Sequence, residues 1–254
     1  LMSTQPSYVV PRDYQDYTTE QEIKRSRFIC HLRRADSEDD ARQHVADIRK
    51  AYPDARHHCS AFITAASDEA DDMPDKVNAP LMLIERSSDD GEPAGTAGQP
   101  MLNVLRESGM TNVCAVVVRY FGGTKLGAGG LVRAYSDSVA QTVSIAPTSR
   151  RRRALRMTFI VSISDAGRVE SALRSDDWSV EPTVYGSGAP EDARPLDTSA
   201  TQLNEGSGGS GSIAQINVVV SPSDVDAVVS AVAALTQGVF NTYETGITWR
   251  ETST

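Results

Sequence analysis

The sequence predicts an α+β protein made of two domains. The chain has 254 residues, which is more than one domain of ordinary size requires. Alternation of apolar and polar residues indicates strands, and apolar residues three or four apart indicate helices, in both halves. Pro147 then separates the last helical pattern of the first half from an arginine-rich run. We expect a flexible N-terminus at 1–14, a first domain at 15–146, a linker at 147–153 and a second domain at 154–254.

The first domain begins with a strand whose two sides differ. Phe28, Cys30 and Leu32 alternate with polar residues, so the strand is expected to bury one side only. The other side is expected to be an exposed basic face formed by Arg25, Arg27, His31 and Arg33. The further elements expected here are a helix at 37–52 capped by Ser37, strands at 57–65 and 112–120, a glycine-rich loop at 122–130 and a helix at 131–145.

The second domain shows strand and helix patterns in the order βαββαβ, which is the ferredoxin-like motif. Alternation predicts strands at 155–163, 178–185, 216–220 and 243–249, with helices after the first and third. The connection between the second and third strands is long and ends in a run of glycine and serine. We therefore expect a flexible insertion near 186–212.

Composition excludes several classes of protein. The formal net charge is -9, so the chain is not a basic nucleic-acid coat protein, although a local basic surface is still compatible with it. No apolar run approaches the length that a membrane span needs. The three cysteines, Cys30, Cys59 and Cys114, are widely spaced, which argues against disulfides and metal knuckles and favours a reducing cytoplasm. We predict no metal and no cofactor.

The segment 119–135 leads from a buried strand through glycines into a helix. Free amides at a helix N-terminus attract anions, and glycine lets a phosphate approach the backbone closely. Tight packing of the turn explains the glycines equally well, and both interpretations stay open. The candidate anion-binding residues are Arg119, Gly122, Gly123, Lys125, Gly127, Gly129, Gly130 and Arg133.

An acidic loop at 88–100 is the second candidate site. Asp89, Asp90 and Glu92 lie beside turn glycines and Thr96, a possible helix cap. Clustered carboxylates suit a hard cation or acid–base chemistry, but a solvated acidic turn explains them more simply. Cys59 with a neighbouring histidine is conceivable as a nucleophile, although a buried structural thiol is the favoured interpretation.

These residues resemble the two signatures of the IMPACT/YigZ family, in its bacterial two-domain branch. The matching stretches are SDDGEPAGTAGQP at 88–100 and RYFGGTKLGAGGLVRAY at 119–135, with Ser26–Ile29 and His57–His58 as earlier landmarks. Ala94 stands where the family pattern is expected to have serine, which argues against an essential hydroxyl at that position. The resemblance implies that the first domain has the fold of domain four of elongation factor EF-G and of a ribosomal-protein domain.

The same resemblance implies a role in translation, because eukaryotic members regulate it by binding a protein partner. Our leading hypothesis is a cytoplasmic, non-catalytic protein that contacts RNA or the ribosome through the basic face and the glycine-rich loop. One alternative is an enzyme or sensor that binds a small phosphorylated ligand in the glycine-rich cleft. The other is a regulatory module that binds translation-factor proteins. The sequence decides neither whether the protein catalyses a reaction nor its oligomeric state. For each group of residues that could be catalytic, a structural role explains the sequence at least as well.

Overall fold

The computed structural model describes residues 7–66, 81–175, 178–190, 193–196, 198, 200–203 and 212–253. These residues divide into two compact units. The N-terminal unit comprises the described residues up to Arg151 together with those from Glu251 onward. The C-terminal unit comprises the described residues from Arg152 to Arg250.

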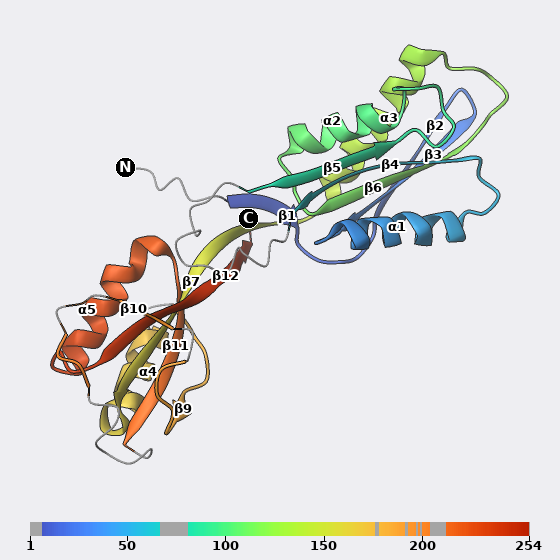
Figure 1. The fold of residues 1–254 in the computed structure, drawn as a ribbon. Helices are drawn as coiled ribbons and strands as arrows, with labels where there is room; N and C mark the ends of the chain where they lie inside the picture. The colour runs from blue at the N-terminus through green and yellow to red at the C-terminus, as the bar shows by residue number, and fades with distance from the viewer. Residues whose placement is uncertain are drawn as a thin grey trace. The chain divides into compact units, whose positions relative to one another are not determined.

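The N-terminal unit is built on an antiparallel sheet with the strand order β2-β3-β6-β4-β5 (Figure 1). Its strands are β2 (Tyr17–Ile23), β3 (Ser26–Arg34), β4 (His57–Ala65), β5 (Leu83–Ser88) and β6 (Val113–Tyr120). Its helices are α1 (Glu38–Ala51), α2 (Gly98–Ser108) and α3 (Ala128–Ile145). The central strand β6 pairs with both β3 and β4, which explains why it is buried along almost its whole length.

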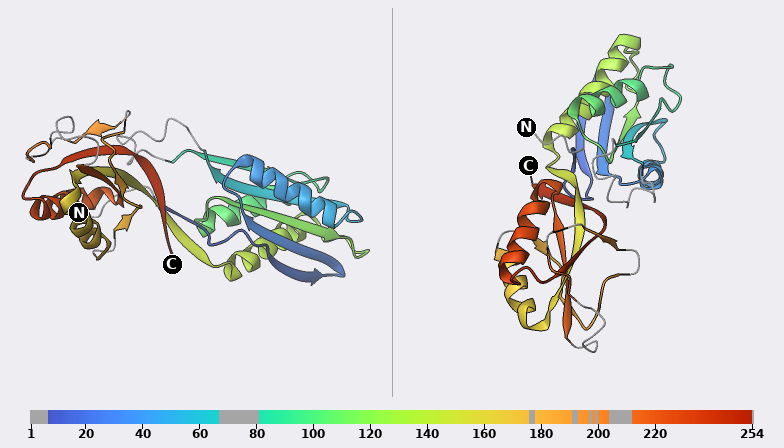
Figure 2. Two further views of the ribbon diagram at one scale, coloured as in Figure 1. Left: turned by 90° about the horizontal axis from the view of Figure 1, so that it is seen from below. Right: turned by 60° about the vertical axis from the view of Figure 1, so that its left-hand side comes forward.

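Helices cover both faces of this sheet, with α2 and α3 on one face and α1 on the other (Figures 1 and 2). Because successive strand residues point to opposite faces, Val117 packs in the core under α2 and α3 whereas Val116 packs under α1. The continuous apolar run of β6 is the pattern expected of a strand buried on both sides. Helix α1 starts as predicted, since the Ser37 Oγ accepts a hydrogen bond from the Asp40 amide at 3.0 Å.

The C-terminal unit contains the predicted βαββαβ order. The elements are β7 (Thr148–Ser162), α4 (Ile163–Ser175), β8 (Ser179–Val180), β11 (Ile213–Val220), α5 (Val225–Leu235) and β12 (Asn241–Ser253). Their strands lie in the order β12-β7-β11-β8. Two short strands, β9 (Val184–Tyr185) and β10 (Arg194–Pro195), pair with β11 and β12 respectively. Helices α4 and α5 lie side by side on one face (Figure 2) and close a core around Phe159 and Phe240.

Two segments that were expected to lack structure form strands. Residues Ser7–Pro11, inside the expected flexible N-terminus, form β1, which pairs with β7. Residues of the expected linker at 147–153 form the first part of β7, and Arg153 there is only 2% exposed. Pairing between segments so far apart in the sequence supplies backbone partners that no local pattern records.

The expected flexible insertion near 186–212 is partly ordered. Strand β10 lies within it, and the Thr201 amide donates to the Gly238 carbonyl at 2.8 Å. Residues 204–211, which hold most of the glycine and serine run, lie outside the described residues. None of the helices in the described ranges combines the length and hydrophobicity needed to cross a membrane.

Candidate functional site

The glycine-rich loop ends earlier than predicted, because α3 begins at Ala128 and includes Gly129 and Gly130 in its first turn. Gly127 precedes the helix with a φ of 75°, a left-handed value that favours glycine, and Gly123 has a φ of 84°. No side chain in the described part of the chain caps the helix, and Gly127 and Gly129 are exposed. The first amides of an α-helix have no acceptor within the helix, so those of α3 are left for a partner from outside it.

The loop is anchored to the turn between β2 and β3. The Gly122 amide donates to the Ser26 Oγ at 3.1 Å, and Arg25 donates from Nη2 to the Thr124 Oγ1 at 3.2 Å. A Cβ atom at Gly122 would lie 2.0 Å from the Arg25 carbonyl carbon, so only glycine allows this approach. Gly122 thus serves packing, which was one of its two predicted uses.

The turn itself consists of two basic residues in the left-handed region. Lys24 has a φ of 49° and Arg25 a φ of 65°, and both are exposed. Turns with positive φ at both central positions normally contain asparagine or glycine, so basic residues here are held at some cost in backbone strain. Such strain is concentrated at functional sites in proteins generally.

We call the surface formed by Lys24, Arg25, Phe121 and Lys125 the basic tip. Lys125 is exposed, and Phe121 is 54% exposed although it is a large aromatic residue. The Arg25–Thr124 hydrogen bond and the Gly122 contact join its two loops. The basic tip therefore combines positive charge with an exposed aromatic ring, and the chain runs from it into the uncapped N-terminus of α3. Arg133 is also exposed, one turn into α3.

The predicted basic face of β3 is not a free cationic surface. His31 is 7% exposed, and its ring nitrogens lie 3.2 Å from the Thr18 Oγ1 and 3.1 Å from the Tyr52 hydroxyl oxygen. Arg27 forms an ion pair with Glu20 on the neighbouring strand. Arg33 forms ion pairs with Asp16 at 2.7 Å and with Asp47 at 3.4 Å. Of the four predicted residues, only Arg25 belongs to the basic tip. The expectation failed because α1 covers this side of β3 and because Glu20 of β2, Asp16 before it and Asp47 of α1 supply carboxylates.

The first two carboxylates of the acidic loop, Asp89 and Asp90, hold the structure together through hydrogen bonds within the protein. Asp89 accepts hydrogen bonds from the amides of Gly95 at 2.8 Å, Ala97 at 3.0 Å and Gly98 at 2.8 Å, and so caps α2. Burial raises the pKa of Asp89, but these three amides outweigh it and hold that pKa below its usual range. Asp90 accepts from Arg49 at 2.9 Å and from the His58 amide at 2.7 Å.

The remaining carboxylate, Glu92, joins the two signature segments. Its Oε1 accepts hydrogen bonds from Arg119 Nη1 at 2.5 Å and from the Tyr135 hydroxyl at 2.8 Å. The Arg119 and Glu92 side chains are 7% and 3% exposed, respectively. Arg119, predicted to bind an anion, is thus neutralised within the protein. Thr96 donates to the Pro93 carbonyl at 2.6 Å, which stabilises the acidic loop from within.

The cysteine candidate is likewise structural. Cys59 is fully buried, and its thiol donates to the Asp89 carbonyl at 3.0 Å. Burial raises its pKa to about 12, so it is a thiol and not a thiolate at neutral pH. His57 Nδ1 lies 3.0 Å from the Asp90 carbonyl oxygen, in the same loop. Within the described ranges, no three histidine, cysteine or acidic side chains are grouped to hold a metal ion.

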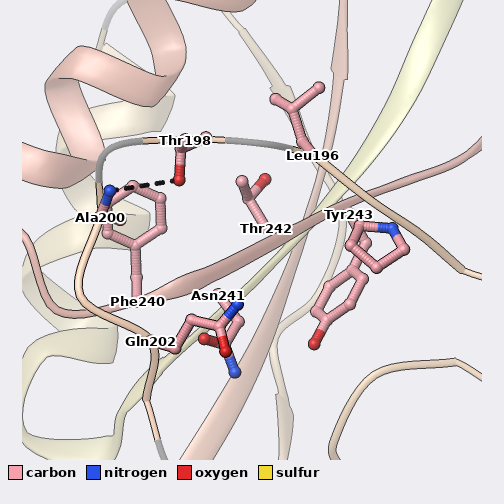
Figure 3. A pocket seen from close by; sticks show the side chains of 9 residues that line it. Leu196, Thr198, Ala200, Gln202, Phe240, Asn241, Thr242 and Tyr243 are labelled. Atoms are coloured by element: carbon pink, nitrogen blue, oxygen red, sulfur yellow. Dashed lines mark hydrogen bonds between the residues drawn. The ribbon is translucent and has the colours of Figure 1, made fainter.

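Two pockets of about 440 Å³ each lie elsewhere on the surface. One is in the C-terminal unit, where Leu196, Gln202 and Phe240 are among the side chains around it (Figure 3). Thr198 and Ala200 also line it. The other lies between α1 and β5 in the N-terminal unit. Neither pocket is lined by residues of the glycine-rich loop.

Sequence reasoning missed Lys24 altogether. Arg25 and Arg27 fit the alternating pattern of the strand that follows, so this pattern predicts a strand from Arg25 and no turn before it. The signal available was the Lys24–Arg25 pair between two alternating segments, Tyr17–Ile23 and Ser26–Arg34. A two-residue gap of this kind indicates a hairpin turn even without glycine.

Comparison with known proteins agrees with the sequence signatures. The family model described as the Impact N-terminal domain matches residues 24–143. The IMPACT family member YvyE of Bacillus subtilis (strain 168) is 38% identical over 163 residues, which cover 64% of this chain and 69% of that protein. The IMPACT family member YigZ of Escherichia coli (strain K12) is 39% identical over 168 residues, or 66% of this chain and 76% of that protein.

A crystal structure described only as that of a hypothetical protein has a similar fold. It is 30% identical, with a TM-score of 0.55, and the match covers 94% of this chain and 97% of that one. Both units therefore have counterparts in a single solved chain.

Proposed function

This chain belongs to the IMPACT family, and we propose that it is a non-catalytic, translation-associated binding protein whose basic tip contacts RNA. The observation that carries the proposal is the strained Lys24–Arg25 turn, held against the glycine-rich loop that runs into the uncapped N-terminus of α3. A chain with a net charge of -9 repels polyanions overall, so phosphate contacts need a locally basic surface of this kind. The role in translation rests on the family resemblance.

Each part of the basic tip suits one part of a single-stranded RNA. Phosphate oxygens bind to arginine and lysine and to amides at a helix N-terminus. An exposed aromatic ring such as that of Phe121 provides a surface on which an unpaired base stacks. An extended polymer fits the tip better than a small ligand does, because no pocket described above opens onto the loop.

The absence of catalysis is inferred from the state of the reactive groups near the loop. Glu92, Arg119 and Tyr135 are bound to one another, and Cys59 is a buried thiol. We further propose a cytoplasmic location and ferredoxin-like and EF-G-like folds for the C-terminal and N-terminal units. The strand order β12-β7-β11-β8 supports the former.

The test is binding of a fluorescent single-stranded RNA across a salt series. Replacing Arg25 and Lys125 by glutamine removes two cationic contacts. The negative slope of the logarithm of the RNA-binding constant against the logarithm of the salt concentration should therefore become shallower by about 1.4. The matched control, Arg168→Gln with Arg174→Gln, removes the same charge from an exposed part of α4 and should leave the slope unchanged. Equal losses in both variants would show that only overall charge matters.

A second variant separates stacking from charge. Phe121→Ala should weaken RNA binding by about tenfold without changing the salt slope, since stacking contributes about 1–3 kcal/mol per base. If none of the proteins binds RNA at low salt, the proposal is wrong. Tip-dependent capture of a translation-factor protein after nuclease treatment would then support the protein-binding alternative.

A further inference from the structure

The groove between α1 and β5 has features of a binding site that the basic tip does not share. It has a volume of about 440 Å³, within the range of small-molecule pockets. Its lining residues are of three kinds: three arginines, three serines and three apolar residues. They are Arg42, Arg49, Arg86, Ser60, Ser87, Ser88, Val45, Ala46 and Phe62.

The spacing of the α1 residues explains how the helix forms one wall. Positions 42, 45, 46 and 49 are three or four residues apart, so they share one face of the helix. The opposite wall and the floor come from the paired strands β4 and β5. Phe62 is opposite Arg86 and Ser60 is opposite Ser88 in the strand register. Phe62 and Val45 belong to the same apolar cluster, which gives the groove an apolar floor.

Two of the three arginines are arranged around one carboxylate group of the protein, that of Glu38. Oε1 of Glu38 lies 2.6 Å from Arg42 Nη2 and 3.8 Å from Arg86 Nε, so the two guanidinium groups converge on one oxygen atom. Arg49 is fixed at another point by Asp90, at 2.9 Å. The side chains of Arg42 and Arg86 are 66% and 59% exposed. Ion pairs this exposed contribute little free energy, so an incoming anion displaces Glu38 at small cost.

We propose that this groove binds a small phosphate-bearing ligand with an apolar or aromatic body. The phosphate takes the position between Arg42 and Arg86 that Glu38 now occupies, because guanidinium groups bind phosphate oxygens in pairs. The body of the ligand lies on Val45 and Phe62, and the hydroxyls of Ser60 and Ser88, which share the groove face with Phe62, hydrogen-bond to its polar edges. The groove is lined by none of the basic-tip residues, so this site goes beyond the proposed RNA contact and does not depend on it.

The test is isothermal titration of the full chain with AMP and phenyl phosphate, and with inorganic phosphate and adenosine as partial ligands. We expect saturable binding of AMP or phenyl phosphate, and binding at least tenfold weaker for each partial ligand. Arg42→Gln with Arg86→Gln should weaken binding at least tenfold. Glu38→Gln should strengthen it severalfold, because it removes the internal competitor of the phosphate.

Two control variants make the result specific. Arg174 forms the same kind of exposed (i, i+4) ion pair with Glu170 that Arg42 forms with Glu38, but it lies on α4. Arg174→Gln should therefore leave the titration unchanged. Lys125→Gln, at the basic tip, should also leave it unchanged, which separates this site from the RNA contact. The proposal is overturned if neither phosphate ester binds. It is equally overturned if inorganic phosphate binds as well as AMP, or if the Arg42 and Arg86 replacements have no effect.

Discussion

The buried ion pair between Glu92 and Arg119 gives a sharp prediction about stability. Glu92→Gln keeps the shape of the side chain and one acceptor oxygen, but it leaves the guanidinium of Arg119 buried without a counter-charge. Removing one member of a buried pair costs about 3–5 kcal/mol. Arg119 also lies 5.4 Å from the Phe28 ring centroid and 5.7 Å from that of Phe121. These rings offset part of the loss, so we expect about 3 kcal/mol.

The assay is urea-induced unfolding followed by circular dichroism, with the midpoint and slope compared between variants. The matched control is Glu107→Gln, which makes the same chemical change at an exposed position on α2 and should cost less than about 0.5 kcal/mol. Because the partners are in contact, Glu92→Gln combined with Arg119→Met should cost clearly less than the two single losses added together. The double variant therefore measures the coupling directly.

One result would refute this reasoning. If Glu92→Gln unfolds at the same urea concentration as the Glu107 control, the pair does not hold the two signature segments together. Arg119 would then be available for a ligand, as the sequence had predicted. A stability loss with no coupling in the double variant would show instead that Glu92 acts mainly through the Tyr135 hydroxyl.

Three further predictions follow from single contacts. Asp89→Asn weakens the cap of α2 and should cost about 2 kcal/mol at pH 7. Since the folded pKa of Asp89 is lowered, its contribution is complete above about pH 5 and is lost in acid, so urea unfolding should show a flatter acid profile for the variant. Gly122→Ala should lower the unfolding free energy by at least about 2 kcal/mol, whereas Gly129→Ala, with open space around its Cβ, should be neutral or stabilising. His44 lies on α1 and is buried, and this burial lowers its pKa to about 4. The folded state therefore resists its protonation, and stability falls as pH drops below about 6.5. In the native chain this lowers the unfolding free energy between pH 7 and pH 4, and His44→Leu should reduce that loss by up to about 3 kcal/mol. Urea unfolding at both pH values measures it. If the variant loses as much stability as the native chain, the lowered pKa of His44 is contradicted.

The regular elements were predictable because their signals are local. The buried run of β6, the Ser37 cap of α1 and the βαββαβ order of the second half all depend on residues within a few positions of one another. The signature at 119–135 likewise indicated a glycine-rich turn before a helix, and α3 follows the loop as expected. Its boundary was misplaced by three residues, because glycine is a poor helix former and Gly129 and Gly130 read as loop.

The charges could not be assigned in this way. Arg33 is paired with Asp16, 17 residues away, and Arg119 with Glu92, 27 residues away. Lys24 was not among the candidates predicted from the sequence, and Arg27 was placed on an exposed basic face although Arg27 is paired with Glu20. Nothing in the local pattern distinguishes a paired cation from a free one. The segment Ser7–Pro11 was missed for a related reason, as a short strand is defined by its partner.

The sequence by itself determined the family, the βαββαβ order of the second half, and the positions of the two signature loops. Backbone conformation responds to neighbours along the chain, and the alternation of apolar residues records which faces are buried. Only the tertiary structure decided which charged groups of those loops remain available to a partner. Ion pairing depends on separations of a few ångströms in space, and the chain fixes these only once the sheet has brought distant residues together.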